Sequence, residues 1–146
     1  MFIRPLALAF VAALAAPAFA AGVADLVEVD RPMVRAAAPG MTVSGAYMTV
    51  RNTDGTDHEL VSAHSDVAEN VELHTHAMED GMMKMRRVDS VPLPANSEVA
   101  FEPGGLHIML IGLARDLNEG DSVEMALEFE DGSRRDVTFE VGRGGH

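Results

Sequence analysis

Residues 122–141 read SVEMALEFEDGSRRDVTFEV and predict a β-hairpin. Apolar residues alternate with polar ones on both sides of a turn at Glu130-Asp131-Gly132-Ser133. Such alternation is typical of strands that bury one face, and Asp-Gly is one of the strongest short-range hairpin signals. The C-terminal part of the chain is therefore expected to form two antiparallel strands that cover a core.

A similar pattern extends over most of the sequence. Proline and glycine recur at short intervals, and the segments between them are short, with alternating or β-branched residues. No segment combines a sustained helical period with caps at both ends. This spacing is typical of a single all-β domain, a sandwich or a barrel. The other expected strands are residues 45–51, 70–76, 98–102 and 106–111.

The first twenty residues predict a secretory signal peptide. Arg4 supplies a positive charge, residues 6–16 form an apolar run, and Ala18-Phe19-Ala20 is the small-x-small pattern that signal peptidase accepts. The run is shorter than the roughly 20 apolar residues of a membrane-spanning helix. We expect residues 1–20 to be removed, which leaves a periplasmic domain of residues 21–146 with no membrane span.

Charge and cysteine content restrict the function. The chain has 11 Lys and Arg against 23 Asp and Glu, a formal net charge of −12, which argues against a nucleic-acid partner. It has no cysteine, so no disulfide holds the fold, and neither a cysteine-rich zinc site nor a blue-copper centre can be built. A soft-metal site in this chain has to use methionine and histidine.

A second hairpin is expected in residues 72–87, ELHTHAMEDGMMKMRR. With a two-residue turn at Asp80-Gly81, Glu79 is opposite Met82 and the outer pairs follow from there. A turn longer or shorter by one residue would move the methionines to the opposite face. Because side chains of a strand alternate between faces, this register places five candidate ligands together: His74, His76, Met78, Met83 and Met85.

Residues 106–110, LHIML, carry a second pair of the same residue types. Leu106, Ile108 and Leu110 are expected to point into the core, and His107 and Met109 to the outer face. Cu(I) accepts thioether sulfur and imidazole, whereas Mg²⁺ and Ca²⁺ prefer oxygen. We therefore expect a Cu(I) site on this face.

The remaining methionines and histidines have simpler interpretations. Methionine in a β domain is usually a core filler, and this is expected of Met33, Met41, Met48, Met82 and Met125. His58 and His64 are interpreted as surface or hydrogen-bonded residues.

The spacing of His74, Met85, His107 and Met109 resembles the H-x10-M-x21-H-x-M signature of the periplasmic copper chaperones called PCuAC. The segments MEDGMMKMR, PGGLHIMLIGL and EGDSVEMALEF also resemble blocks of that family. The resemblance implies a cupredoxin-like Greek-key β-sandwich that binds one Cu(I) through these four residues. It also implies copper delivery towards cytochrome c oxidase, with an oxidase subunit or another assembly factor as the partner.

His76 occupies a position where some members of that family have methionine. It is a further candidate, as a ligand, as a group that supports the ligands, or as part of a secondary Cu(II) site with His74.

Two other classes of function remain as alternatives to a copper chaperone. A copper redox enzyme usually needs three or more histidines, and only His74, His76 and His107 are available here. No Ser-His-Asp or paired-carboxylate arrangement indicates another enzyme. The second alternative is a β-sandwich interaction module in which the methionines and histidines bind no specific metal. The interpretation that we prefer is binding and transfer of copper, not catalysis.

Overall fold

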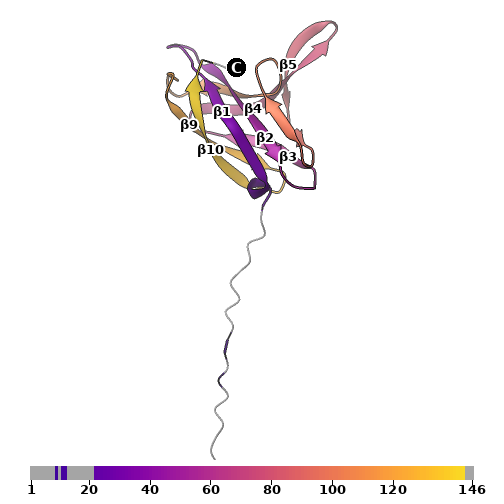
Figure 1. Ribbon diagram of the computed structural model, residues 1–146. Helices are drawn as coiled ribbons and strands as arrows, with labels where there is room; N and C mark the ends of the chain where they lie inside the picture. The colour runs from indigo at the N-terminus through magenta and orange to yellow at the C-terminus, as the bar shows by residue number, and fades with distance from the viewer. Residues whose placement is uncertain (1–8, 10, 13–21, 144–146) are drawn as a thin grey trace, which may run out of the picture.

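The computed structural model describes residues 9, 11, 12 and 22–143. Within this part, one short 3-10 helix is followed by ten strands, so the all-β prediction is confirmed (Figure 1). The prediction of a signal peptide falls almost wholly outside the described residues and stays a prediction. The elements are η1 (Val23–Leu26), β1 (Val27–Arg35), β2 (Val43–Asn52), β3 (His58–His64), β4 (Ala68–Glu79), β5 (Met82–Val88), β6 (Val91–Leu93), β7 (Glu98–Phe101), β8 (His107–Leu113), β9 (Ser122–Phe129) and β10 (Arg134–Gly142).

All ten strands belong to one continuous sheet. Its order is β5-β4-β8-β2-β1-β10-β9-β3-β6, and β7 pairs with β2 off this path. Neighbours such as β4 and β8 are far apart in the sequence, as the long connections of a Greek key require. Strands β3 and β4 lie near opposite ends of the order but contact each other. The sheet therefore folds back on itself, and its two halves are the layers of the expected sandwich (Figure 1).

The core lies between these two halves. Phe129 of β9, Phe139 of β10 and Leu60 of β3 are fully buried in one hydrophobic cluster, which also contains Ile108 and Leu110 of β8. The hairpin expected at residues 122–141 is confirmed, with β9 and β10 antiparallel and Glu128 opposite Arg134. This register is shifted by one residue from that of a two-residue Asp-Gly turn, because residues 130–132 form the loop and only Gly132 has a positive φ, 81°. Its inward-facing side chains alternate with exposed ones, as expected for strands that bury one face.

The β4–β5 hairpin has the register that its sequence predicts. Glu79 is opposite Met82 and His76 is opposite Met85. Asp80 has φ 50° and Gly81 has φ 76°, and positive φ at both central positions is the requirement of the favoured type I′ turn. β5 is the last strand of the sheet order and pairs with β4, so its outer edge is free. The hairpin extends beyond the body of the molecule (Figure 1).

The predictions for the remaining methionines are confirmed in part. Met48 and Met125 are buried in the core, and Met33 is half-buried. Met41 and Met82 are exposed, so for them the prediction of core packing is wrong. Met41 lies in the connection between β1 and β2, and Met82 lies on the extended hairpin, where no second layer covers it. Among the described residues, no helix is long and apolar enough to cross a membrane.

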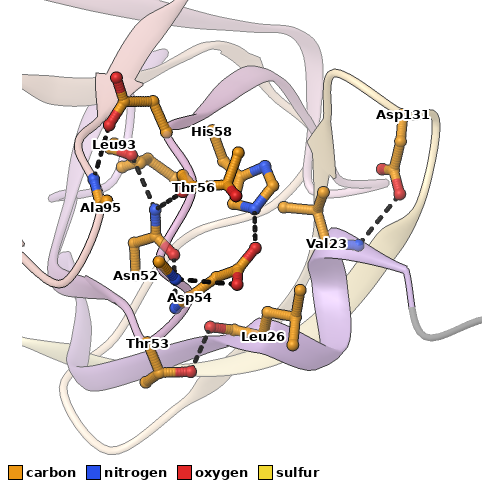
Figure 2. A network of polar contacts seen from close by, with 12 residues as sticks. Val23, Leu26, Asn52, Thr53, Asp54, Thr56, His58, Leu93, Ala95 and Asp131 are labelled. Atoms are coloured by element: carbon orange, nitrogen blue, oxygen red, sulfur yellow. Dashed lines mark hydrogen bonds and ion pairs between the residues drawn. The ribbon is translucent and has the colours of Figure 1, made fainter.

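A polar network joins η1 to the segment after β2 (Figure 2). Asn52 is fully buried, and its side-chain amide donates to the carbonyls of Thr56 and Leu93 at 2.9 Å. His58 lies between two carboxylates, with Nε2 2.7 Å from Asp54 Oδ2 and Nδ1 2.5 Å from Glu130 Oε1. Hydrogen bonds to Asp54 and Glu130 raise the pKa of His58, and burial opposes this shift. The expectation that His58 is a hydrogen-bonded residue is confirmed.

Candidate metal centre

Three neighbouring strands bring the predicted ligands onto one face of the sheet. On β4, His74 is opposite His107 of β8, and His76 is opposite Met85 of β5. Met109 follows two residues after His107, so it shares the face of His107. The sheet therefore brings together His74, His76, Met85, His107 and Met109, which come from the β4–β5 hairpin and from β8, a strand distant from it in the chain.

His107 is the most enclosed of these side chains. It is 6% exposed, so the expected outward-facing strand surface is in fact covered, because β4, β5 and the Gly105 loop surround the ring. Its Nδ1 lies 3.0 Å from the carbonyl oxygen of Gly105. A carbonyl can only accept, so Nδ1 carries the hydrogen and Nε2 keeps a free lone pair.

That lone pair faces a sulfur atom. His107 Nε2 lies 3.2 Å from Met85 Sδ. Burial lowers the pKa of His107, and the neighbouring His74 and His76 lower it further. The hydrogen bond to Gly105 raises this pKa, but by less than burial lowers it. The ring is therefore neutral at neutral pH, and two lone-pair donors face each other without a hydrogen between them.

His74 has a different environment. Both of its ring nitrogens are buried and have no hydrogen-bond partner. The nearest carboxylate oxygen, Glu72 Oε2, is 3.7 Å from Nε2, which is beyond hydrogen-bond distance. A buried polar group without a partner costs roughly 1–3 kcal/mol, and a metal ion would satisfy it.

His76 lies beside the same ring. The centroids of the His76 and His107 rings are 5.3 Å apart, and those of His74 and His107 are 5.7 Å apart. His76 Nδ1 is 3.4 Å from the carbonyl oxygen of Gly105, the same atom that orients His107. One backbone carbonyl therefore influences the orientation of two of the three imidazoles.

A cavity of about 290 Å³ opens beside these residues. Its lining includes His76, Met85, His107 and Met109, and adds Met41, Tyr47 and Gly45. A Cβ atom on Gly45 would come within 2.8 Å of the Tyr47 hydroxyl oxygen, so this glycine leaves room for the Tyr47 ring. No local sequence pattern indicates Met41, Tyr47 or Gly45 as lining residues, because they reach the cavity through the packing of β2 and the preceding loop.

The donor atoms fit a soft, singly charged ion. With zinc bond lengths of about 2.0 Å to nitrogen and 2.3 Å to sulfur as a guide, two tetrahedral ligand atoms are roughly 3.5 Å apart. The 3.2 Å between His107 Nε2 and Met85 Sδ is close to that value. Within residues 22–143, no group of three or more His, Asp or Glu is placed to hold a metal ion. Neutral nitrogen and sulfur ligands without a carboxylate favour Cu(I) over Mg²⁺, Ca²⁺ or Zn²⁺.

These features define an all-β domain with an imidazole–thioether cluster on one sheet face. Solved structures share this fold. The structure described as a copper-bound PCuAC domain from PmoF2 has a TM-score of 0.68 and 27% identity, and the match covers 84% of this chain and 95% of that one. The structure described as CuI-DR1885 from Deinococcus radiodurans has a TM-score of 0.62 and 29% identity, over 79% of this chain and 76% of that one. The expected PCuAC-type fold is confirmed.

Sequence comparison identifies the family. Residues 27–141 match the family model described as "LpqE-like: Putative lipoprotein LpqE-like", and the chain belongs to the LpqE-like family. The protein named "Putative lipoprotein Lxx21020" of Leifsonia xyli subsp. xyli (strain CTCB07) is 37% identical over 119 residues, which cover 81% of this chain and 70% of that protein.

Proposed function

We propose that this protein is a copper chaperone that binds one Cu(I) through His74, Met85, His107 and Met109 and passes it to an acceptor protein. The observation that carries the proposal is the approach of His107 Nε2 to Met85 Sδ, 3.2 Å, with Nδ1 already engaged by Gly105. The unpartnered nitrogens of His74 support it. The similarity to structures described as copper-bound and CuI-bound supports the choice of ion.

The ligand types suit an exported copper carrier. A thioether is neutral and loses no proton when it binds a metal, so binding depends less on pH than at a thiolate site. It cannot form a disulfide, unlike the cysteines of other soft-metal sites. We also propose that residues 1–20 are removed as a signal peptide and that the protein acts in the periplasm. His76 is proposed as a supporting group of the Cu(I) centre, or as the partner of His74 in a secondary Cu(II) site.

Release follows from the position of Met85. Its side chain is 46% exposed and belongs to β5, the edge strand of the sheet, whereas His107 and Met109 lie on β8 between β4 and β2. An acceptor can displace Met85 first and share the ion with the remaining ligands before it takes over. An acceptor with thiolates binds Cu(I) more strongly than thioethers do. We propose a cytochrome c oxidase subunit or another assembly factor as that acceptor.

The activity proposed is transfer without catalysis. The four ligands hold only two histidines, fewer than a copper redox enzyme usually needs, and steady-state oxidation by copper-loaded protein would contradict the proposal. A β-sandwich interaction module is the other alternative, and it predicts no stoichiometric copper binding.

An anaerobic Cu(I) titration against a competing chelator tests the binding. The wild type is expected to hold one equivalent. The double variant Met85→Leu, Met109→Leu keeps side-chain volume but removes both sulfur atoms. Its loss of affinity is expected to exceed the roughly 10- to 100-fold effect of mutating a group that only supports a ligand. Met125→Leu, a buried methionine on β9, is the matched control and is expected to bind as the wild type does.

Transfer is tested separately. Copper-loaded protein is mixed with a soluble oxidase copper-domain that has two acceptor cysteines, and the copper on each protein is measured after separation. Movement of copper to the acceptor supports the chaperone function. Copper that stays on this chain would contradict it, even if the binding titration succeeds.

A further inference from the structure

The exposed apolar side chains of this protein are chemically selective. Within residues 22–143, every large hydrophobic side chain that is exposed is a methionine. Exposed apolar residues are common on proteins and are of several types. If these residues were exposed without a function, valine, leucine or phenylalanine would be expected among them. The five exposed residues share a sulfur atom. Met41 lies before β2, and the other four lie on the β4–β5 hairpin: Met78, Met82, Met83 and Met85.

Two of these methionines form a pair that the candidate centre does not use. Met78 and Met83 are directly opposite each other across the hairpin, and they are 66% and 57% exposed. Directly opposed residues have Cβ atoms about 4.5–5.5 Å apart, so two flexible thioethers can converge on one ion.

The Met78–Met83 pair shares the face of the candidate centre. The next pair inward on that face is His76 and Met85. Two residues along a strand advance by about 7 Å. Successive pairs on this face are therefore soft ligands, from the Met78–Met83 pair at the tip to the pair that includes Met85. Met85 in turn contacts the ring of His107.

The charges of the hairpin leave this face open to a cation. Lys84 and Arg86 alternate to the opposite face, where both contact Glu79, with Lys84 Nζ 4.0 Å from Glu79 Oε2. Arg87 is on the ligand face further inward, and its guanidinium is 3.7 Å from Glu72 Oε1. The neighbouring cations are thus paired with carboxylates, and at the tip the ion meets neutral sulfur.

We propose that Met78 and Met83 form a second Cu(I) site, the tip site, which captures the ion from its donor and passes it inward to His76, Met85 and the centre at His107. This inference rests on the proposed function. Each step is a ligand exchange: a bond from copper to a thioether of the tip site breaks as a bond to the inner nitrogen or sulfur forms. Copper stays in the +1 state and no proton moves. Two exposed thioethers hold the ion weakly, which suits a site of entry.

Methionine methyl resonances report on the tip site directly. Protein labelled with ¹³C at the methionine methyl groups is titrated with Ag(I), a redox-stable substitute for Cu(I), and resonances are assigned by Met→Leu variants. The first equivalent is expected to shift Met85 and Met109 in slow exchange. Excess Ag(I) is then expected to shift Met78 and Met83 together in fast exchange, while buried Met48 and Met125 stay unchanged. Static Met78 and Met83 resonances in excess Ag(I) would overturn the proposal.

The rate of copper uptake tests the role of the tip site. The variant Met78→Leu, Met83→Leu is compared with Met82→Leu, which removes an exposed methionine from the other face of the same hairpin. Stopped-flow uptake of Cu(I) from a chelator is expected to slow several-fold in the double variant only, with an unchanged final affinity. Equal uptake rates in the two variants would overturn the inference.

The failures of the two proposals are distinguishable. If the wild type binds no equivalent of Cu(I) or Ag(I) at all, the proposed function fails. If Met85 and Met109 respond but Met78 and Met83 do not, only the tip site fails.

Discussion

His74 lies opposite His107 on neighbouring antiparallel strands, with ring centroids 5.7 Å apart, but the two rings are held differently. His107 is oriented by the Gly105 carbonyl, whereas neither nitrogen of His74 has a hydrogen-bond partner. The imidazole of His107 is therefore already oriented to bind a metal ion through Nε2, whereas the imidazole of His74 has no hydrogen-bond partner in the metal-free protein.

His74→Leu is expected to separate stability from copper binding. Removing a buried polar group that has no partner is neutral or stabilising, so the metal-free variant is expected to gain up to about 1 kcal/mol in free energy of unfolding. At the same time, the increase in melting temperature that Cu(I) produces is expected to shrink, because a ligand is lost. Thermal unfolding with and without Cu(I) measures both. A metal-free variant that is markedly less stable than the wild type would show that His74 has a structural role.

The pair of carboxylates around His58 predicts a pH dependence of stability. Their hydrogen bonds raise the pKa of His58 in the folded protein above the 6.5 of the free side chain. The stabilisation is therefore fully present below pH 6.5 and is lost as the pH rises through the raised folded pKa. Urea unfolding between about pH 6 and 9 is expected to show falling stability in the wild type. His58→Gln is expected to flatten this slope; an equal slope in the variant would assign the effect to other groups.

Gly81→Ala tests the turn of the β4–β5 hairpin. Gly81 has φ 76° and nothing lies within 4 Å of an added Cβ, so the variant meets backbone strain and no clash. A left-handed conformation costs a residue with a side chain about 1–2 kcal/mol. We expect faster hydrogen exchange of β5 amides and weaker Cu(I) binding through Met85, with little change in global unfolding. Gly55→Ala is the control, because Gly55 also has open space but no positive φ. Equal exchange rates in both variants would contradict the local effect.

Core packing sets the scale of global stability. Phe139 is fully buried on β10, and Phe139→Ala is expected to lower the free energy of unfolding by about 3–5 kcal/mol. Met125→Leu keeps the volume and is expected to cost less than about 1.5 kcal/mol. Denaturant titration measures both values, and similar losses in the two variants would contradict the role of cavity formation at Phe139.

The sequence was most informative where a local turn determines a register. Asp80-Gly81 supplies the two positive φ values of a type I′ turn, so the pairing of His76 with Met85 could be predicted from the hairpin alone. Strands β1, β3 and β6 are not among those expected from the sequence, and in β1 Pro32 interrupts the alternating pattern. The structure accommodates Pro32 at a shift of register between Asp30 and Met33, beside Arg31 with φ 49°. A proline at such an irregularity leaves the rest of the strand intact.

The residues that surround the candidate centre could not be predicted from the sequence. The resemblance to the PCuAC signature implies His74, Met85, His107 and Met109 as ligands, and the sheet brings these residues together. The burial of His107 and the role of the Gly105 carbonyl depend on how β4 and β8 pack beside one loop. No local pattern encodes such contacts between distant segments.

The exposure of Met85 has a chemical cost. An oxidant such as hydrogen peroxide converts methionine to its sulfoxide, which is polar and is no longer a soft thioether ligand. Met85, 46% exposed, is open to this reaction, whereas Met48 and Met125 are each 2% exposed and sheltered. A metal ion on the sulfur withdraws electron density from it, so the bound thioether reacts more slowly with an oxidant. A carrier without its metal ion is therefore expected to lose the Met85 ligand to oxidation faster than one whose sulfur is coordinated.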